Sequence, residues 1–224
     1  MISDVFFDLD HTLWDFEKNS ALAMKKVFDL HGITVCCDTF LEHYVPINFE
    51  YWERFRKDEI TQQQLRYERL KDTFDKISHD ISDDTIGMIS EDYIKYLPTF
   101  NHLFDGAKEL LDYLSPKYRL HIITNGFHQV QNTKLTNAGI FTYFRTITNS
   151  ETVGRKKPHP VIFEYALKAA NASKETSLMI GDCIDADVRG ALDYGMKAIL
   201  FCNGGAGYPG IQQINHLSEL KSVL

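Results

Sequence analysis

The stretch VFFDLD at residues 5–10 decides the fold of this chain. It opens with apolar β-formers, and the apolar run ends abruptly at Asp8 and Asp10. A short apolar run of this kind, bounded by polar residues, is typical of a strand buried on both faces of a sheet. We therefore expect a buried strand close to the N-terminus, with two carboxylates at the point where it ends.

Helical spacing follows this strand at once. Between residues 16 and 97 the apolar residues recur as they do on one face of a helix. Helix start signals occur at Thr39, Thr61 and Ser82, and Gly32 is a stop signal. We expect four helices in this stretch and no strand.

Beyond Pro98 the pattern changes again, because short apolar runs alternate with helical segments. The expected strands are Leu120–Ile123, Thr146–Thr148, Leu178–Ile180 and Ala198–Phe201, and the expected helices lie at about 105–114, 127–138, 160–171 and 186–194. This alternation predicts right-handed βαβ crossovers and a parallel sheet that resumes the first strand. The expected fold class is α/β: a Rossmann-like parallel sheet core formed by residues 1–15 and 98–224, with an inserted all-helical domain at 16–97.

Length and composition agree with one core carrying an inserted module, since 224 residues with 44% hydrophobic content can bury a substantial core. The 31 acidic residues outnumber the 24 Lys and Arg residues and give a formal net charge of -7. This balance disfavours the broad basic surface that binding of a nucleic acid polymer requires. An anionic substrate must then be held by locally placed cations.

The sequence also bears on location. The N-terminus has no basic region followed by a long apolar stretch, and no window reaches the roughly 18 apolar residues of a spanning helix. The four cysteines lack metal-type spacing, and the adjacent pair at 36 and 37 is a poor start for a disulfide framework. We expect reduced thiols, a cytoplasmic protein and no membrane partner.

Chemistry is expected beyond the carboxyl ends of the strands, where ligands bind in open parallel sheets. The polar residues placed there are Asp8, Asp10, Thr124, Asn125, Lys157, Asp182, Asp185 and Asp187. Each signal alone has an ordinary structural explanation: a turn, a helix cap, a solvated lysine, or an acid that favours a helix dipole. Their convergence on one edge of the sheet favours a functional site.

The acidic residues imply a cation, because carboxylates pressed together repel one another unless a positive charge neutralises them. An all-oxygen acidic site suits Mg²⁺. Opposite it, the Thr124 hydroxyl, backbone N–H groups at a helix start and the Lys157 ammonium are the groups that a phosphate dianion needs. Because a lysine at the edge of a sheet supports little of the core, we expect its loss to damage catalysis more than folding.

Four motifs in order resemble those of the haloacid dehalogenase superfamily phosphatases. They are Asp8-Leu9-Asp10-His11-Thr12, Thr124-Asn125-Gly126, Lys157-Pro158 and Gly181-Asp182 followed by Asp187. The resemblance spans nearly the whole chain and implies that the helical insertion is a cap that closes over the site. Residues 123–127, Val153-Gly154 and the segment 51–61 are similar to the pyrimidine 5′-nucleotidase branch, although His11 stands where many relatives have glycine.

The resemblance implies that Asp8 is the nucleophile, which forms an aspartyl-phosphate and divides the hydrolysis into two easier steps. It makes Asp10 the general acid and base, which protonates the leaving oxygen and then activates water. Mg²⁺ is expected as the cofactor, bound by the Asp8 and Asp182 side chains and the Asp10 carbonyl.

The remaining motif residues are expected to hold the transferring phosphoryl group or to order the metal site. Thr124, Asn125 and Lys157 fall in the first group, and Asp187 orients the metal shell and Lys157. The implied partner is a small phosphorylated metabolite, with nucleoside monophosphates as the expected substrates. Trp14 and Phe127 lie just after strands and could stack on a base.

Three alternatives remain open. The substrate could be a small sugar phosphate or phosphoglycolate instead of a nucleotide. A 2-haloacid dehalogenase also needs a nucleophilic Asp but has no leaving oxygen to protonate, so Asp10 argues against it. A non-catalytic phosphoacceptor switch combines acids, a Thr and a Lys on a parallel sheet, but it lacks an inserted helical domain.

Overall fold

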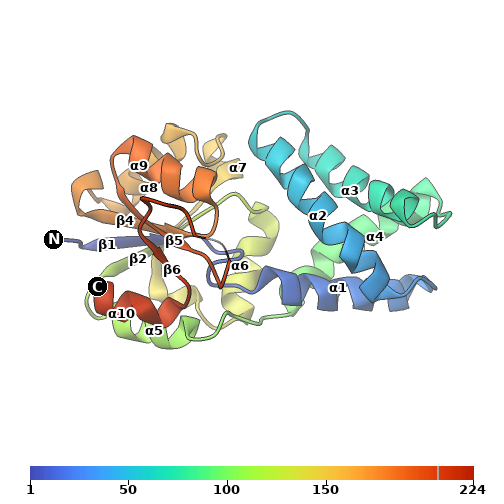
Figure 1. Ribbon diagram of the computed structural model, residues 1–224, viewed down its shortest axis with the longest axis horizontal. Helices are drawn as coiled ribbons and strands as arrows, with labels where there is room; N and C mark the ends of the chain where they lie inside the picture. Colours follow the sequence, from blue (N-terminus) through green and yellow to red (C-terminus); the bar gives the residue numbers. More distant parts are fainter. Residues whose placement is uncertain (206) are drawn as a thin grey trace. The chain divides into compact units, whose positions relative to one another are not determined.

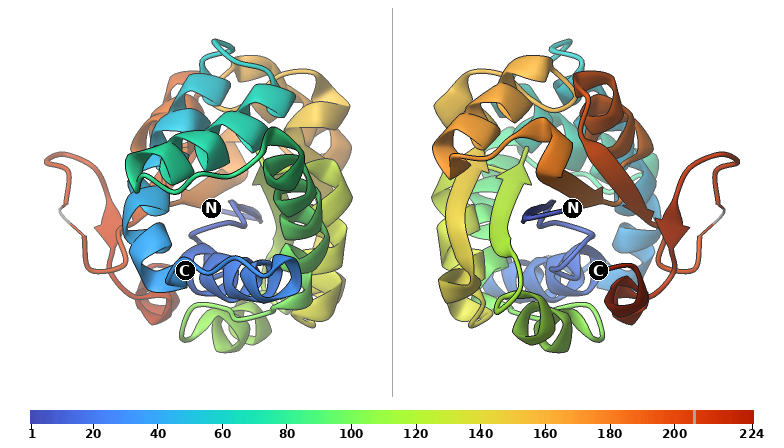
Figure 2. Two further views of the ribbon diagram at one scale, coloured as in Figure 1. Left: turned by 90° about the vertical axis from the view of Figure 1, so that its right-hand side faces the viewer. Right: turned by 90° about the vertical axis from the view of Figure 1, so that its left-hand side faces the viewer.

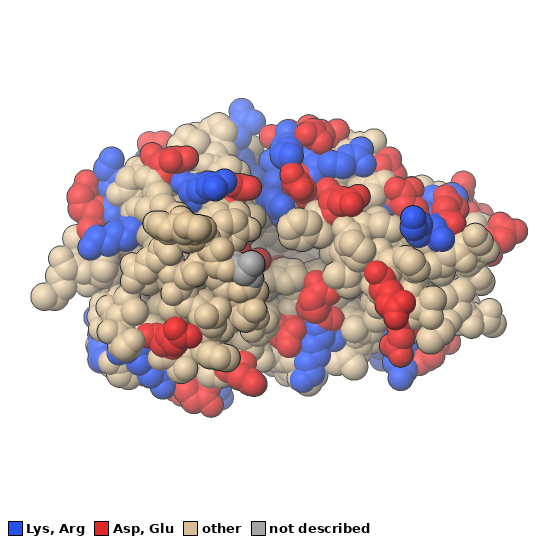
Figure 3. Space-filling model, in the orientation of Figure 1, with Lys and Arg blue, Asp and Glu red and all other residues tan. Residues whose placement is uncertain are grey.

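In the computed structural model, which describes residues 1–205 and 207–224, the chain divides into two compact units. One unit comprises Met1–Phe16 and Asn101–Leu224, and the other comprises Glu17–Phe100. The first holds the sheet and the second is helical (Figure 1). Surface charges of both signs are interspersed on the face drawn in Figure 3.

The sheet is parallel throughout, with the strand order β3-β2-β1-β4-β5-β6. The strands are β1 (Asp4–Phe7), β2 (Arg119–Thr124), β3 (Phe144–Asn149), β4 (Ser177–Gly181), β5 (Lys197–Phe201) and β6 (Gln213–Ile214). Every residue of β1 is buried, as expected for the central strand of a sheet covered on both faces. β3 and β6 lie at the two margins of the sheet (Figure 2).

Helices cover both faces of this sheet. They are α5 (Ala107–Leu114), α6 (His128–Asn137), α7 (Ser150–Val153), α8 (Pro160–Ala170), α9 (Gly190–Tyr194) and α10 (Leu220–Val223). α8 and α9 pack on one face, where Phe163 and Ala191 join Phe6 and Met179 of the sheet in a buried cluster. α5 and α10 lie together on the other side (Figure 1). The α/β class and the parallel sheet predicted from the sequence are confirmed.

The helical unit contains α2 (Cys37–Arg56), α3 (Gln62–Lys76), α4 (Asp83–Tyr96) and most of α1 (Phe16–His31). Its core includes the rings of Phe28, Phe40 and Phe74. The ring centroid of Phe40 lies 4.9 Å from that of Phe28 and 4.8 Å from that of Phe74. None of the described helices, in either unit, is long and apolar enough to cross a membrane.

Three of the four predicted helix signals are confirmed. Thr61 forms a capping box with Gln64, Ser82 accepts a hydrogen bond from the Thr85 N–H, and Gly32 follows α1 with φ of 64°. The predicted start at Thr39 is wrong.

The N-cap of α2 is Cys36, three residues before Thr39, and the helix begins at Cys37. The Phe40 N–H already donates to the Cys36 carbonyl at 3.0 Å. Asp38 then lies in the first turn, where the helix dipole favours an acid.

A buried carboxylate links β1 to β2 at the end of the strands opposite to Asp8 and Thr124. Asp4 is fully buried and lies beside Arg119 in the strand register. Its Oδ2 accepts hydrogen bonds from Arg119 and from Ser3, each at 2.7 Å, and its Oδ1 lies 3.2 Å from His121 Nε2. Burial raises the pKa of Asp4, but these hydrogen bonds outweigh burial, so its pKa is lowered overall.

Removing the Arg119 guanidinium is therefore expected to weaken the fold in a pH-dependent way. We expect Arg119→Met to lower the free energy of unfolding by about 1.5 kcal/mol at pH 7, the value of a hydrogen bond to a charged group. Because the pKa of Asp4 is lower in the folded state, this contribution is present above the unfolded value of about 3.9 and is lost as the pH falls through the folded value. Urea unfolding at pH 7 and at successively lower pH measures it.

A matched control is Arg189→Met, since Arg189 pairs at 2.7 Å with Asp185 where both side chains are more than half exposed. Such a pair contributes about 0–1 kcal/mol. A difference between Arg119→Met and wild type that stays constant down to the acid transition would contradict the assignment to Asp4.

Candidate active site

Three adjacent strands deliver the candidate site at one edge of the sheet. β2, β1 and β4 are neighbours, and they end at Thr124, immediately before Asp8 and immediately before Asp182. The crossovers bring these residues together, although Asp8 and Asp182 are 174 positions apart in the chain. All the residues described below belong to the unit that holds the sheet.

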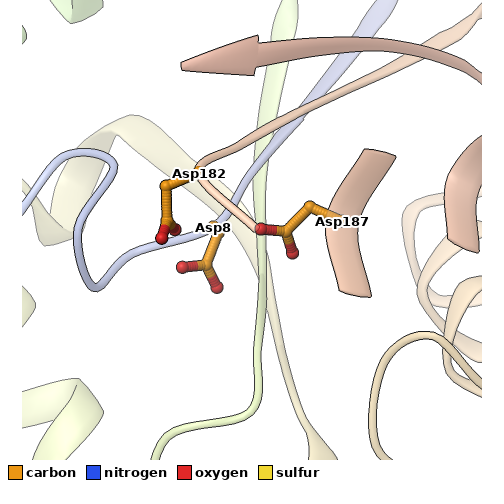
Figure 4. A group of neighbouring side chains, drawn as sticks. All are labelled: Asp8, Asp182 and Asp187. Atoms are coloured by element: carbon orange, nitrogen blue, oxygen red, sulfur yellow. The ribbon is translucent and has the colours of Figure 1, made fainter. Parts of the chain in front are cut away.

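Three carboxylates converge at this edge. Asp8, Asp182 and Asp187 each offer an oxygen, and these oxygens lie within 4.8 Å of one another (Figure 4). Asp187 comes from a π-helical turn at Ile184–Arg189, and its Oδ2 accepts a hydrogen bond from the Cys183 N–H at 3.0 Å. Gly181 makes room for it, because a Cβ at residue 181 would lie 2.3 Å from Asp187 Oδ2.

One buried ammonium faces these acids. Lys157 is 2% exposed, and its Nζ lies 2.6 Å from Asp8 Oδ1 and 2.6 Å from Asp187 Oδ1. It also donates a hydrogen bond of 2.6 Å to the Ile123 carbonyl at the end of β2. Burial disfavours the charged form, but Asp187 and Asp8 outweigh it, so the pKa of Lys157 is raised. The ammonium therefore joins three segments of the chain and remains charged.

The acids carry more charge than the ammonium can balance. Burial raises the pKa of Asp8 well above its usual value, against the opposing effect of Lys157 and with further increases from Asp187 and Asp182. Burial, followed by the charge of Asp187, raises the pKa of Asp182 to about 7. When all three acids are ionised, three negative charges face one positive charge, which leaves two. A site with only oxygen ligands and this excess charge fits Mg²⁺.

The loop after β2 forms the other side of the site. The Thr124 hydroxyl oxygen accepts hydrogen bonds from the Gly126 N–H at 3.0 Å and from Gln131 Nε2 at 2.9 Å, so its own hydrogen is free to be donated. The Asn125 amide pairs with the Lys157 backbone: Nδ2 donates to the Lys157 carbonyl at 3.0 Å, and Oδ1 accepts from the Lys157 N–H at 2.8 Å. The structure thus places the Asn125 side chain on the lysine backbone.

Asp10 is held apart from the other carboxylates. Its Oδ1 accepts a hydrogen bond from Lys134 Nζ at 2.6 Å, and its Oδ2 accepts one from Gln131 Nε2 at 2.9 Å. Oδ2 lies 3.0 Å from the position of a Cβ on Gly126, so the carboxylate borders the loop after β2. Two carboxylates at the end of one strand therefore have different partners.

Sequence reasoning did not find Gln131 and Lys134. Both lie on α6, and they share its buried face with Val130 and Leu135. The available signal was that polar residues occupy positions where the helical pattern calls for apolar ones. The structure therefore adds two buried polar side chains to the predicted site.

The other predicted residues have ordinary surroundings. Trp14 is fully buried, with the Lys134 ammonium 4.2 Å from the centre of its ring, and Phe127 is 3% exposed. Asp185 pairs with Arg189 at the surface. Neither aromatic ring offers an exposed face, and Asp185 lies apart from the carboxylate cluster.

Comparison with known proteins places this geometry in a family. The model of the haloacid dehalogenase-like hydrolases matches residues 4–195. Among curated proteins, pyrimidine 5′-nucleotidase PynA of Streptococcus pneumoniae is 31% identical over 88% of this chain and 82% of its own. The glyceraldehyde 3-phosphate phosphatase of Pyrococcus abyssi is 32% identical over 91% of this chain and 83% of its own.

A solved structure agrees with this placement. The HAD-hydrolase YfnB from Bacillus subtilis, crystallised with magnesium and described as revealing interdomain movement, has a TM-score of 0.90 and 27% identity. The match covers 100% of this chain and 98% of that one. The chain belongs to the haloacid dehalogenase-like hydrolases.

Proposed function

We propose that this protein is a magnesium-dependent phosphomonoester hydrolase that acts through an aspartyl-phosphate on Asp8, with nucleoside monophosphates as substrates. The observation that carries the proposal is the contrast between the two carboxylates that follow β1. Asp8 lies beside Lys157 and two further acids, whereas Asp10 is held by α6. A nucleophile and a separate proton carrier two residues apart are what this chemistry needs.

The reaction has two steps. In the first, an Asp8 oxygen bonds to phosphorus, the bond from phosphorus to the ester oxygen breaks, and Asp10 gives a proton to that leaving oxygen. In the second, Asp10 takes a proton from water, the water oxygen bonds to phosphorus, and Asp8 is released with inorganic phosphate. Each bond formed is matched by one broken, and Asp10 returns to its starting form.

The surrounding groups hold the phosphoryl group during both steps. Lys157, already 2.6 Å from Asp8, is placed to neutralise negative charge on the transferring oxygens. The Thr124 hydroxyl has its hydrogen available for a phosphate oxygen. Asn125 supports them indirectly, because its amide fixes the backbone of the lysine.

Asp8 and Asp182 are the proposed metal ligands, together with the Asp10 carbonyl, and Asp187 orders them through Lys157 and the Cys183 N–H. When bound, Mg²⁺ supplies positive charge that stabilises the phosphoryl oxygens in the transition state. The YfnB structure, which is bound to magnesium, supports this cofactor.

Similarity to PynA supports nucleoside monophosphates, since that protein is named a pyrimidine 5′-nucleotidase. We assign the helical unit as a cap whose closure excludes water and aligns the substrate. Binding energy from a base distant from the phosphorus can drive such a closure. Because Trp14 and Phe127 are buried, we assign the contacts with the base to other residues.

A second candidate is a small sugar phosphate. The 32% identity to a glyceraldehyde 3-phosphate phosphatase is as high as the identity to the nucleotidase, and it covers slightly more of this chain. The same catalytic residues serve both substrate classes, so the two candidates differ in the substrate contacts and not in the chemistry.

A kinetic panel at fixed Mg²⁺ separates these candidates. We expect pyrimidine nucleoside monophosphates to be hydrolysed with a kcat/KM at least about tenfold above those of glyceraldehyde 3-phosphate and phosphoglycolate, which corresponds to about 1.4 kcal/mol of extra transition-state binding. Phosphate release by the purified protein is the measurement, and excess chelator is expected to abolish it. Re-addition of Mg²⁺ should restore it.

The outcomes distinguish the levels of the proposal. Sugar phosphates that outrank every nucleotide would overturn the substrate class and leave the phosphatase chemistry standing. Full activity in excess chelator would overturn the metal assignment. A 2-haloacid that is turned over when no phosphomonoester is would replace the phosphatase with a dehalogenase.

A further inference from the structure

α6 directs two buried side chains at a single carboxylate. Gln131 and Lys134 are three residues apart, so they lie on the same face of the helix. Lys134 Nζ donates a hydrogen bond to Asp10 Oδ1 at 2.6 Å, and Gln131 Nε2 donates one to Asp10 Oδ2 at 2.9 Å. Each oxygen of the carboxylate thus has its own donor, which fixes its rotation about the Cβ–Cγ bond.

The two donors are themselves held in place. Gln131 is 1% exposed, and its Nε2 also donates to Thr124 Oγ1 at 2.9 Å. Lys134 is 2% exposed, and its ammonium lies 4.2 Å from the centre of the Trp14 ring. A Cβ on Gly126 would lie 1.6 Å from Gln131 Nε2, so the glycine leaves this amide the space it occupies.

Stability alone does not account for this arrangement. Replacing a buried ion pair by apolar side chains of similar volume is often neutral or stabilising, so a buried pair is weak evidence of a stabilising role. Gln131 Oε1, moreover, is buried without a hydrogen-bond partner among the described residues, which costs free energy. The Gln131 amide thus donates hydrogen bonds to Asp10 and Thr124, while its own carbonyl oxygen accepts none within the described part of the chain.

We propose that Gln131 and Lys134 are positioning residues that aim the Asp10 carboxylate at the ester oxygen in the first step and at water in the second. This inference rests on the proposed function and extends it to residues outside the four motifs. Gln131 in addition links the proton carrier to the phosphate-binding hydroxyl of Thr124, so that one amide sets the distance between two parts of the site.

Two substrates that differ by one CH₂ group test the proposal. A p-nitrophenolate leaves without protonation, whereas the alkoxide of p-nitrobenzyl phosphate needs a proton from Asp10. General acid catalysis contributes about 10²–10⁴-fold, so we expect Lys134→Met and Gln131→Leu to lower kcat/KM for the benzyl ester by about tenfold to a hundredfold. The kcat/KM for the phenyl ester, which reports only transfer to Asp8, should change by less than about threefold.

A second readout comes from the phenyl ester alone. Because Asp10 also activates the water, slower hydrolysis of the aspartyl-phosphate should lower kcat and produce a burst of p-nitrophenol before the steady state. A variant that is only partly folded would show both ester rates reduced by the same factor, without a new burst. Gln131→Leu keeps the contact between Lys134 and Asp10, so it remains informative should Lys134→Met fold poorly.

Controls come from exposed positions. Gln129→Leu changes an exposed glutamine on the same helix, and Lys108→Met changes an exposed lysine on α5. Both should leave the ratio of the two esters at the wild-type value. Thermal unfolding of each variant gives the folded fraction.

Three results would overturn the inference in distinguishable ways. If wild type hydrolyses both esters and the ratio of their kcat/KM values is unchanged in both variants, the positioning role is wrong and the phosphatase stands. If wild type hydrolyses nucleoside monophosphates and neither ester, an unchanged kcat/KM for a nucleotide in both variants overturns the positioning role alone, because the leaving alkoxide of a nucleotide also needs a proton. If wild type releases phosphate from neither ester and from no nucleoside monophosphate or sugar phosphate, the proposed function fails and the inference falls with it.

Discussion

Asp8→Asn is expected to lower kcat for phosphomonoesters by about 10⁴-fold or more, the scale of loss seen when an enzyme loses its nucleophile. The amide has nearly the shape of the carboxylate but cannot attack phosphorus. Lys157 keeps its contacts with Asp187 and with the Ile123 carbonyl, so the fold should survive. Phosphate release at saturating substrate is the measurement.

The same variant has a stability signature. The pKa of Asp8 is raised in the folded protein, so its ionised form is disfavoured there, and removing that charge relieves repulsion from Asp187 and Asp182. Thermal unfolding in excess chelator should therefore find Asp8→Asn at least as stable as wild type. An exposed acid supplies the control: Asp185→Asn should leave kcat unchanged. Turnover by Asp8→Asn at the wild-type rate would exclude Asp8 as the nucleophile.

The parts of the fold that could be predicted are those with a repeating signal. β1 is a short apolar run that ends in acids, and the alternation of strands and helices after Pro98 fixes a parallel sheet. Because the carboxyl ends of such strands meet at one edge, acids that follow two strands far apart in the sequence could be expected to meet as well. The structure brings Asp8, Asp182 and Asp187 together there.

What could not be predicted depends on single contacts between distant residues. β6 has two residues, too few for a period to be seen. In the sequence, Gln131 and Lys134 belong to a polar stretch of a helix, and only the fold shows that both contact Asp10. Asn125 is expected to hold phosphate, and its amide also pairs with the Lys157 backbone, a contact across 32 positions that no local pattern reveals.

The contacts of Lys157 lead to a different expectation from the one based on its place in the sequence. From its place in the chain it was expected to matter for catalysis more than for folding. In the structure it is 2% exposed and contacts Asp8, Asp187 and the Ile123 carbonyl, each at 2.6 Å. Because this lysine contacts three segments of the chain, we expect it to support the fold as well as the proposed chemistry.

We therefore expect Lys157→Met to be destabilised by about 3–5 kcal/mol in the absence of metal, because breaking a buried pair leaves uncompensated charges behind. The exposed Lys108→Met serves as the matched control and should unfold like wild type. Chemical unfolding in excess chelator measures both. A Lys157→Met protein that is inactive but as stable as wild type would restore the purely catalytic interpretation.

Magnesium should act differently on the two proteins. When all three acids are ionised, they leave two unbalanced negative charges in wild type and three without the ammonium, so a divalent cation should bind the folded variant more tightly. A ligand that binds the folded state stabilises it by an amount that grows as Kd falls. The rise in Tm on adding Mg²⁺ should therefore be larger for Lys157→Met than for wild type. The kcat of Lys157→Met should nevertheless stay low, because Mg²⁺ does not restore the positive charge that Lys157 places beside the phosphoryl group. Equal rises in Tm would mean that the lysine and the metal do not share these carboxylates.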